Sequence, residues 1–264
     1  MKRDKILICV DNLDDINEYE KLDIVNFLFP LENYSIGYNT FSFEEIKAFN
    51  SAYILINRLL TDEDIDNFIK LEIPNNIKGF VIEDIGLIDI LKSKGYEVIL
   101  FQNHLNNNYE TINYWLKYVD SLVISTDITK EEIKEIIDKA DKPLVLNTFL
   151  LPMIMYSRRR LVSNFYRHIG KDSKNEIAIN EKISNSNFLI KESTYGSAVF
   201  NNKILDYRDF TKELNQEKIK FYLFNSAHID KNTIIKGIKN EKVDNTTTGF
   251  LDKKTIYKVG DKRD

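Results

Sequence analysis

Eight short runs of apolar and β-branched residues, separated by more polar segments, are the sequence feature that most restricts the fold. The runs are residues 6–10, 24–29, 52–59, 78–83, 97–102, 121–126, 143–149 and 220–225. Short, continuously apolar runs are typical of parallel strands that are buried on both faces. Parallel neighbours need a crossover connection, which is usually a helix. The pattern therefore predicts strands that alternate with helices.

Five of the intervening segments have apolar residues at every third or fourth position, which predicts amphipathic helices. These segments are residues 42–50, 61–71, 85–95, 108–119 and 129–140. Two of them begin with capping-box spacing, Ser42 with Glu45 and Thr129 with Glu132. In such a box the hydroxyl accepts from the amide three residues on, and the carboxylate accepts from the cap amide. The local sequence thus predicts where these helices begin.

Eight strand-helix units predict a TIM-like (β/α)₈ barrel of irregular form, and a doubly wound open sheet is the alternative. The interval 150–219 is too long for one crossover. We expect an arginine-rich helix in it, followed by a hairpin-like pair of antiparallel strands in 187–207 around Gly196. The prediction is one barrel domain over residues 1–242, with this insertion after the seventh strand, and a C-terminal strand and tail over 243–264.

Charge and cysteine content exclude several classes of protein. With 37 basic and 41 acidic residues the net charge is -4, so nucleic acid or membrane binding would need a local patch. Cys9 is the only cysteine, and the three histidines lack metal-binding spacing, so we expect no disulfide, metal or cofactor. Apolar stretches fall short of the ~20 residues that span a bilayer. We predict a cytoplasmic protein that does not enter a membrane.

In a (β/α)₈ barrel the catalytic face lies at the C-terminal ends of the strands. Glu83 or Asp84 could act there as a general acid or base, but adjacent strand residues face opposite sides, so only one can enter the barrel. His104 could polarise a substrate or bond to the backbone. Any one polar residue there could simply cap a helix or close a turn. The polar residues at these ends are Asp11, Asn57, Arg58, Glu83, Asp84, Gln102, Asn103, His104, Ser125, Thr126, Asn147, Thr148, Asn225, Ser226 and His228.

Half of the chain's arginines lie within one short segment. Guanidinium groups bind phosphate and carboxylate through paired hydrogen bonds, and neighbouring aromatic rings such as Phe165 can stack on bases. The alternatives are a solvated helix face, or arginines that neutralise acidic helices of the same barrel. The pattern favours anion binding over these alternatives. The clustered arginines are Arg158, Arg159, Arg160 and Arg167.

The segment YSRRRLVSNFY, residues 156–166, resembles the YSGRCLLSNY-type signature of peptidase family U-32, the collagenase-like bacterial proteins. The resemblance implies a barrel-like α/β fold and peptidase activity. It also implies relatives that help to hydroxylate tRNA or rRNA bases or ubiquinone precursors, and that hold an iron-sulfur cluster on cysteines. Further stretches fit the family in the same order, at residues 52–71, 79–100, 119–137 and 247–251.

At the cluster cysteines the sequence departs from this signature. The alignment puts Arg160 where one cysteine belongs, Met153 roughly where its partner belongs, and Arg158 in place of the glycine. The resemblance therefore predicts a divergent member that lacks the cluster. The positions that it carries over are Tyr156, Ser157, Arg159, Leu161, Ser163, Asn164 and Tyr166.

Three functions follow as hypotheses. In the first, the protein is a hydrolase of peptide substrates, with Glu83, His104 and Ser157 as catalytic candidates and Tyr156 beside the arginines as a substrate- or anion-binding residue. In the second, it is a non-catalytic or accessory RNA-binding protein of RNA modification. In the third, it is a cluster-less partner in a heteromer with a related family member. The second hypothesis assigns phosphate binding to Arg158, Arg159, Arg160 and Arg167.

Overall fold

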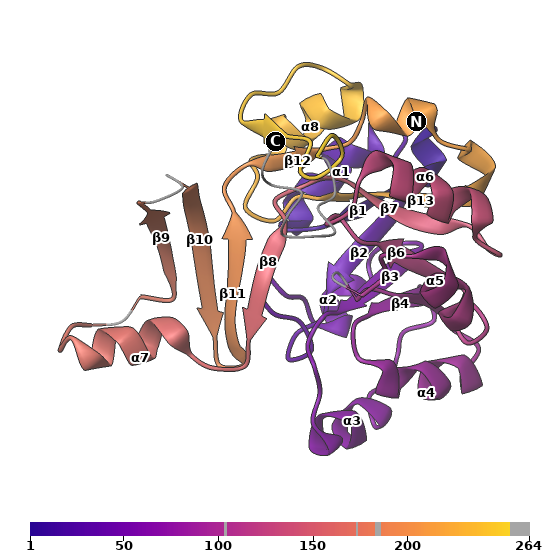
Figure 1. Ribbon diagram of the computed structural model, residues 1–264. Coiled ribbons are helices and arrows are strands. Elements are labelled where there is room, and N and C mark those ends of the chain that lie inside the picture. Colours follow the sequence, from indigo (N-terminus) through magenta and orange to yellow (C-terminus); the bar gives the residue numbers. More distant parts are fainter. Residues whose placement is uncertain (103–104, 173, 183–185, 254–264) are drawn as a thin grey trace.

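The computed structural model describes residues 1–102, 105–172, 174–182 and 186–253. Among them, eight parallel strands form a closed barrel (Figure 1). The last strand closes it by pairing with both the first and the seventh. This confirms the predicted (β/α)₈ barrel and excludes an open sheet. The strands are β1 (Ile6–Cys9), β2 (Asn26–Pro30), β3 (Ala52–Ile56), β4 (Ile77–Ile82), β5 (Glu97–Leu100), β6 (Ser121–Ile124), β7 (Leu144–Leu150) and β13 (Ile219–Asn225).

Helices connect the strands on the outside of the barrel, and both predicted capping boxes are present. A third box joins Thr61 to Asp64, where Asp stands in the position that Glu or Gln usually takes. The α-helices are α1 (Ile16–Glu20), α2 (Phe43–Ile46), α3 (Asp62–Ile69), α4 (Ile88–Ser93), α5 (Tyr109–Trp115), α6 (Lys130–Lys139) and α8 (Lys231–Lys239). Short 3₁₀ helices are η1 (Arg3–Lys5), η2 (Leu13–Asp15), η3 (Ile85–Leu87), η4 (Phe210–Glu213) and η5 (Gln216–Lys218).

Alternate residues of each barrel strand enter two different apolar layers. On β3, for example, Ile54 packs in the layer between the strands and the helices, whereas Leu55 packs inside the barrel. Because both layers are apolar, the strands appear in the sequence as continuous apolar runs. At the C-terminal ends the inward positions become polar. These positions hold Asn57, Glu83, Ser125, Asn147 and Asn225.

Between β7 and β13 the chain forms a second, antiparallel sheet, which is larger than the predicted hairpin. In Figure 1 this sheet extends to one side of the barrel, with α7 (Leu161–His168) at its end. Gly196 forms the predicted tight turn at φ +136°, where a Cβ would lie 2.1 Å from the Ser157 carbonyl oxygen. The sheet order is β8 (Met153–Ser157), β11 (Gly196–Asn201), β10 (Ser186–Ser193) and β9 (Glu176–Glu181).

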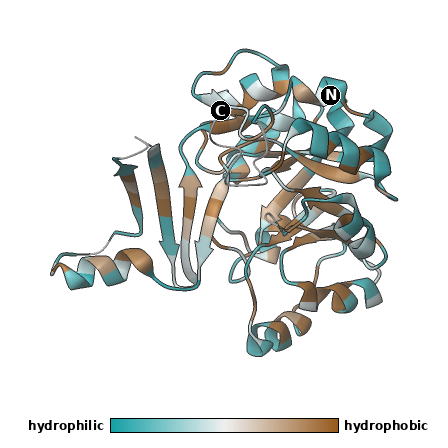
Figure 2. Cartoon of the chain, in the orientation of Figure 1, coloured by the Kyte–Doolittle hydropathy of each residue, from teal (hydrophilic) through white to brown (hydrophobic). Residues whose placement is uncertain are grey.

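The prediction of an arginine-rich helix is only partly correct. Helix α7 begins after the three consecutive arginines, so that of the clustered arginines only Arg167 lies within the helix. The other three occupy the bend between β8 and α7. In Figure 2 the inserted strands and α7 carry both hydrophobic and hydrophilic residues, as expected for elements that are only partly covered.

Several contacts attach the insertion to the barrel, and two of them involve backbone geometry. Gly37, in the loop after β2, has φ +84°, and a Cβ there would lie 2.8 Å from both Met153 Cε and Phe200 Cζ. The strand β12 (Ile204–Asp206) pairs with β7 and with the short C-terminal strand β14 (Thr246–Thr247). The predicted tail over 254–264 lies outside the described residues. Within the described residues, no helix is long and apolar enough to cross a membrane.

Candidate active site

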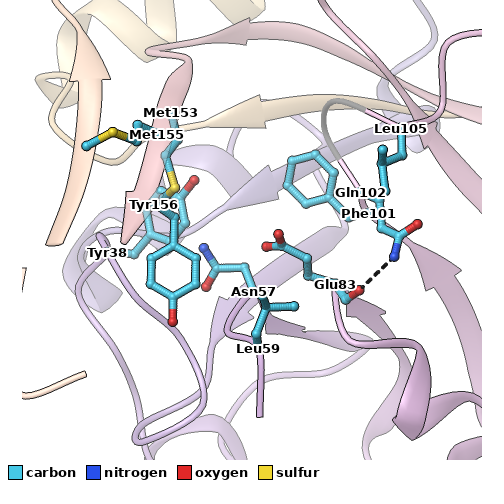
Figure 3. A pocket seen from close by; sticks show the side chains of 10 residues that line it. All are labelled: Tyr38, Asn57, Leu59, Glu83, Phe101, Gln102, Leu105, Met153, Met155 and Tyr156. Carbon is cyan, nitrogen blue, oxygen red and sulfur yellow. Dashed lines mark hydrogen bonds between the residues drawn. The ribbon is translucent and has the colours of Figure 1, made fainter. Parts of the chain in front are cut away.

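A cavity of about 410 Å³ lies at the C-terminal ends of β3, β4 and β5, beneath β8 of the inserted sheet (Figure 3). Its walls come from the strand ends, from the loop after β2 and from β8. Apolar and aromatic side chains dominate, with a few polar groups among them, as is typical of small-ligand sites. The lining residues are Tyr38, Asn57, Leu59, Glu83, Phe101, Gln102, Leu105, Met153, Met155 and Tyr156.

Glu83 presents its carboxylate to this cavity. The side chain is half-buried, and in Figure 3 the carboxylate points into the space between Asn57 and Phe101. Its backbone is held by two bonds, one from the Glu83 amide to the Ile56 carbonyl at 2.9 Å and one from Gln102 Nε2 to the Glu83 carbonyl at 3.4 Å. A carboxylate fixed on a barrel strand in this way is suited to proton transfer.

Asp84 has a different role from Glu83. Its carboxylate accepts from the Gly86 amide at 2.9 Å and from the Leu60 amide at 2.8 Å, so it caps η3 and fixes the loop after β3. Only one of the two adjacent carboxylates enters the barrel mouth, as the strand alternation predicts.

Two tyrosines line the same cavity as the carboxylate. Burial raises the pKa of Tyr38, and nearby Cys9 and Glu83 act in the same direction. Burial also raises the pKa of Tyr156. The positive charges of Arg58 and Arg158 lower this pKa, but burial has the larger effect. Both phenols therefore stay protonated at neutral pH. The Tyr156 hydroxyl is buried, and it has no hydrogen-bond partner within the described part of the chain.

Asn57 and Arg58 stabilise the walls of the cavity. The Asn57 side chain accepts from the Ile36 amide at 3.0 Å and donates to the Ile36 carbonyl at 3.1 Å, which fixes the loop that carries Tyr38. Arg58 is buried, pairs with Asp64 and lies 4.0 Å from the centre of the Tyr195 ring. The Arg58 guanidinium thus interacts with other side chains of the protein.

Asp11 and His228 lie at the barrel mouth but do not line the cavity. Burial raises the pKa of Asp11, and it lowers the pKa of His228. The His228 Nε2 lies 2.8 Å from the Gly37 carbonyl oxygen, and its ring packs on Phe200 with the ring centres 4.7 Å apart. This histidine therefore joins the barrel to the insertion.

Most of the remaining predicted polar residues make hydrogen bonds that hold the strand ends and the loops after them. Ser226 accepts from the Asp11 amide at 2.9 Å and donates to the Cys9 carbonyl at 2.9 Å. Thr148 donates to the Leu146 carbonyl at 2.9 Å. Such bonds close turns and strand ends. Other residues with local bonds or buried positions are Ser125, Thr126, Asn147 and Asn225.

Of the other two predicted catalytic residues, the structure describes only Ser157. The Ser157 hydroxyl accepts from the Arg159 amide at 3.2 Å, and Ser157 is not among the lining residues. His104 and the neighbouring Asn103 lie outside the described residues.

The clustered arginines divide into two groups. Arg160 approaches buried Glu192, with Nε to Oε1 at 3.5 Å, and donates to the Ser163 hydroxyl at 3.2 Å. Arg158, Arg159 and Arg167 are exposed, and they form no ion pair with any described residue. This second group therefore carries positive charges that no carboxylate among the described residues neutralises.

Glu192 is a structural residue that the sequence pattern did not reveal. Its carboxylate accepts from the Val162 amide at 2.7 Å, the Ser163 amide at 3.1 Å and the Ser197 hydroxyl at 3.0 Å. Burial by itself would raise the pKa of Glu192, but these hydrogen bonds outweigh it and hold the pKa below its usual value. The charge stabilises the N-terminus of α7 and attaches the helix to the sheet.

The iron-sulfur cluster of related proteins does not fit this chain. Cys9, the single cysteine, is buried inside the barrel, and burial raises its pKa, so it is held as an unreactive thiol. Among the described residues, no three His, Cys, Asp or Glu side chains lie close enough to hold a metal ion.

The closed barrel, its mouth cavity and the inserted sheet define an α/β-barrel protein of the kind that carries sites at the strand ends. A model of peptidase family U32 matches residues 40–246. This match covers more than half of the chain, so the chain belongs to peptidase family U32. No match was found among curated proteins.

Two solved structures resemble the chain at low sequence identity. The YdjI aldolase from Escherichia coli K12 is 16% identical over 55% of this chain and 66% of the aldolase, with a TM-score of 0.39. The match thus spans just under two thirds of that enzyme. The Bacillus cereus spore cortex-lytic enzyme SleL is 8% identical over 94% of this chain and 76% of that one, with a TM-score of 0.41.

Proposed function

We propose that this family member hydrolyses peptide substrates in the cavity at the barrel mouth. One observation carries the proposal: the Glu83 carboxylate faces a largely apolar, aromatic-walled cavity at the C-terminal ends of the barrel strands. The apolar walls suit a substrate side chain, and the carboxylate suits proton transfer. Membership of a peptidase family supports the same class of reaction.

In the proposed reaction Glu83 acts first as a base and then as an acid. It takes a proton from water as the water oxygen bonds to the peptide carbonyl carbon, and the carbonyl electrons move to the oxygen. When the carbon-nitrogen bond breaks, Glu83 gives the proton to the leaving amine. One water is consumed and no redox partner is needed. The Tyr38 and Tyr156 rings form walls that orient the substrate.

The test is cleavage of gelatin and a peptide library by the full chain, repurified and treated with chelator. We expect Glu83→Gln to lower the cleavage rate by about 10²- to 10⁴-fold, which is the usual contribution of a positioned acid or base. Glu32→Gln removes the same charge from an exposed position in the loop after β2 and should leave the rate unchanged. Cleavage that Glu83→Gln does not affect would contradict the proposal.

RNA binding is a second candidate function, favoured by one observation: Arg158, Arg159 and Arg167 are exposed without ion pairs in the described residues, near Phe165, which is 55% exposed. Binding of single-stranded RNA should weaken with salt by about 0.7 in log-log slope for each phosphate contacted. Changing the three arginines to alanine should abolish it, whereas Glu83→Gln should not. Arg160 is left intact because it pairs with Glu192.

The proposed heteromer with a cysteine-bearing family member and the cytoplasmic location stay predictions. Co-purification of the tagged full chain with such a relative would support the heteromer. A protein that stays monomeric in the presence of the relative would contradict it.

A further inference from the structure

Strand β8 is an edge strand of the inserted sheet, and its free edge is unprotected. It stands at one end of the sheet order and pairs only with β11 among the described strands. A free edge carries unpaired N–H and C=O groups, and proteins usually protect it with charged residues or proline. The opposite edge strand, β9, contains Glu176 and Glu181, whereas β8 has the uncharged sequence MIMYS. Ile154 and Met155 of β8 are 41% and 44% exposed, so another chain can reach this strand.

The register shows which backbone groups of β8 point to the free edge. In an antiparallel pair, residues that hydrogen-bond to the partner strand alternate with residues whose N–H and C=O point away from it. The Asn201 amide donates to the Pro152 carbonyl at 2.9 Å, so the odd-numbered residues of β11 bond to β8. Met155 pairs with Val199 and therefore uses its backbone groups within the sheet. Tyr156, the next residue, directs its N–H and C=O to the free edge.

This free edge faces the candidate active-site cavity. Met155 and Tyr156 are adjacent in the strand, so their side chains leave opposite faces of the sheet, yet both line the cavity. Side chains from both faces can meet one cavity only along an edge of the strand, and β11 occupies the other edge. In Figure 3 these side chains lie across the space from Glu83 and Phe101. A chain added to this edge would therefore lie between β8 and the Glu83 carboxylate.

An extended peptide fits this arrangement. Its main chain offers one donor and one acceptor per residue, which are the groups that the Tyr156 backbone can pair with. The cavity volume of about 410 Å³ is near the lower end of the roughly 300–1,000 Å³ found for ligand pockets, which suits one residue-sized apolar side chain. A bulge at Ile154 interrupts the regular ladder of β8, so we expect pairing at Tyr156 rather than along the whole strand.

We propose that the peptide substrate binds as an added strand on the free edge of β8, with its main chain hydrogen-bonded to the N–H and C=O of Tyr156 and one apolar side chain in the cavity. The inference rests on the proposed peptidase function and deepens it, because it assigns the substrate class as extended peptide segments. Helical and folded segments are excluded, because their main-chain groups are already paired. Tyr156 then binds the substrate through its backbone as well as its ring.

The first experiment measures the affinity of a fluorescent octapeptide that has lysine at both ends, threonine and valine within and one central phenylalanine. It is compared with the same peptide carrying a single N-methyl group at each amide in turn. The full chain carries Glu83→Gln so that turnover does not consume the probe. Methylation of the amide that faces Tyr156 should weaken binding about tenfold, because it removes one main-chain hydrogen bond. The amides directly before and after it are the matched controls, because their N–H groups point away from β8.

A change in the protein tests the same contact from the other side. Tyr156→Pro removes the N–H at the free edge but no hydrogen bond to β11, a position that proline tolerates in edge strands. Tyr156→Ala is its matched control, because it removes the same ring and keeps the N–H. We expect Tyr156→Pro to bind the unmethylated peptide about tenfold more weakly than Tyr156→Ala does. The methylation series decides the question by itself if Tyr156→Pro does not fold.

Equal losses for all methylated peptides, or no loss for any of them, would overturn the inference. So would equal affinity of folded Tyr156→Pro and Tyr156→Ala for the peptide. A dimer that the peptide does not displace and that Tyr156→Pro abolishes would assign the free edge to a second copy of the chain instead. No binding of the unmethylated peptide would also count against the inference.

Hydrolysis assays on the wild-type chain separate this inference from the proposed function. Binding that depends on the one facing amide, without any cleavage, would uphold the inference and reject the peptidase proposal. Cleavage that Glu83→Gln lowers, but that is equally fast with the methyl group on the facing amide or on its neighbours, would uphold the peptidase proposal and reject strand addition.

Discussion

The barrel and the inserted sheet are stabilised by different interactions. Every residue of β1, β3 and β7 is buried, whereas β9 has no buried residue. The barrel strands are covered by helices outside and by one another inside, so apolar burial supplies most of their stability. The insertion depends more on a buried polar anchor, Glu192, and on a few contacts with the barrel rim. We therefore expect the insertion to open locally while the barrel stays folded.

This difference bears on the candidate active site, because the cavity draws on both regions. Glu83 belongs to the end of a barrel strand, whereas Met153 and Tyr156 come from β8 of the insertion. The rigid barrel fixes the carboxylate, and the insertion supplies the opposite wall. Opening of the insertion would expose the cavity without moving Glu83.

The largest effect that separates the two regions is expected for Glu192→Ala. The substitution leaves the Val162 and Ser163 amides without their acceptor. Buried groups left unsatisfied cost about 1–3 kcal/mol each, so we expect the insertion to lose about 3 kcal/mol of stability. Hydrogen exchange should accelerate in α7, β10 and β11 but not in the barrel. Glu176→Ala, at an exposed position, is the control. Equal acceleration in both regions would show that they unfold together.

A smaller effect is expected at the contact between the regions, where Gly37→Ala can be compared with Gly95→Ala. Both glycines have similar positive φ, +84° and +81°, so the backbone strain is shared. At Gly37 a Cβ would also clash with Met153 and Phe200, whereas nothing lies within 4 Å at Gly95. We expect Gly37→Ala to lose about 1–3 kcal/mol more in denaturant unfolding, the usual cost of overpacking. Equal losses of stability in the two variants would mean that Met153 and Phe200 move aside at little energetic cost.

The smallest effect is the pH dependence of the joint at His228. Burial lowers the pKa of His228, and the positive charge of Lys191 lowers it further. The hydrogen bond to the Gly37 carbonyl and the negative charges of Asp11 and Glu176 raise it, but by less. Because the folded pKa lies below the ordinary 6.5, the unfolded chain binds the proton more readily. The stability present above pH 6.5 should therefore decrease as the pH falls through the folded pKa. His228→Gln should show less change in Tm between about pH 7.5 and pH 5.5. An unchanged pH dependence in this variant would rule out His228 as its cause.

Sequence patterns predicted the barrel more completely than the site. All eight apolar runs became barrel strands, because a strand that is buried on both faces must be apolar throughout. Both predicted capping boxes formed, because a capping box depends only on residues three positions apart. Glu83 was predicted from its place at the end of a strand, and it lines the cavity.

The parts of the site that escaped prediction are those that depend on contacts distant in sequence. Tyr38 lies in an irregular loop after β2, and Met153 lies on the inserted sheet, yet both line the cavity with Glu83. In the sequence, Glu192 cannot be distinguished from the exposed acidic residues. The fold brings its carboxylate to the amides of Val162 and Ser163. No local pattern marks such partners.

The sequence by itself determined which segments become barrel strands, where several helices begin and that only one of two adjacent carboxylates can face inward, because these depend on side-chain alternation and on neighbours a few residues away. Only the tertiary structure decided that the sheet closes, that the insertion covers the mouth, that Glu83 is the inward carboxylate and that Arg160 pairs with Glu192. These outcomes rest on pairs such as Cys9 and Ser226, which are 217 positions apart. Such contacts form only when the whole chain has packed.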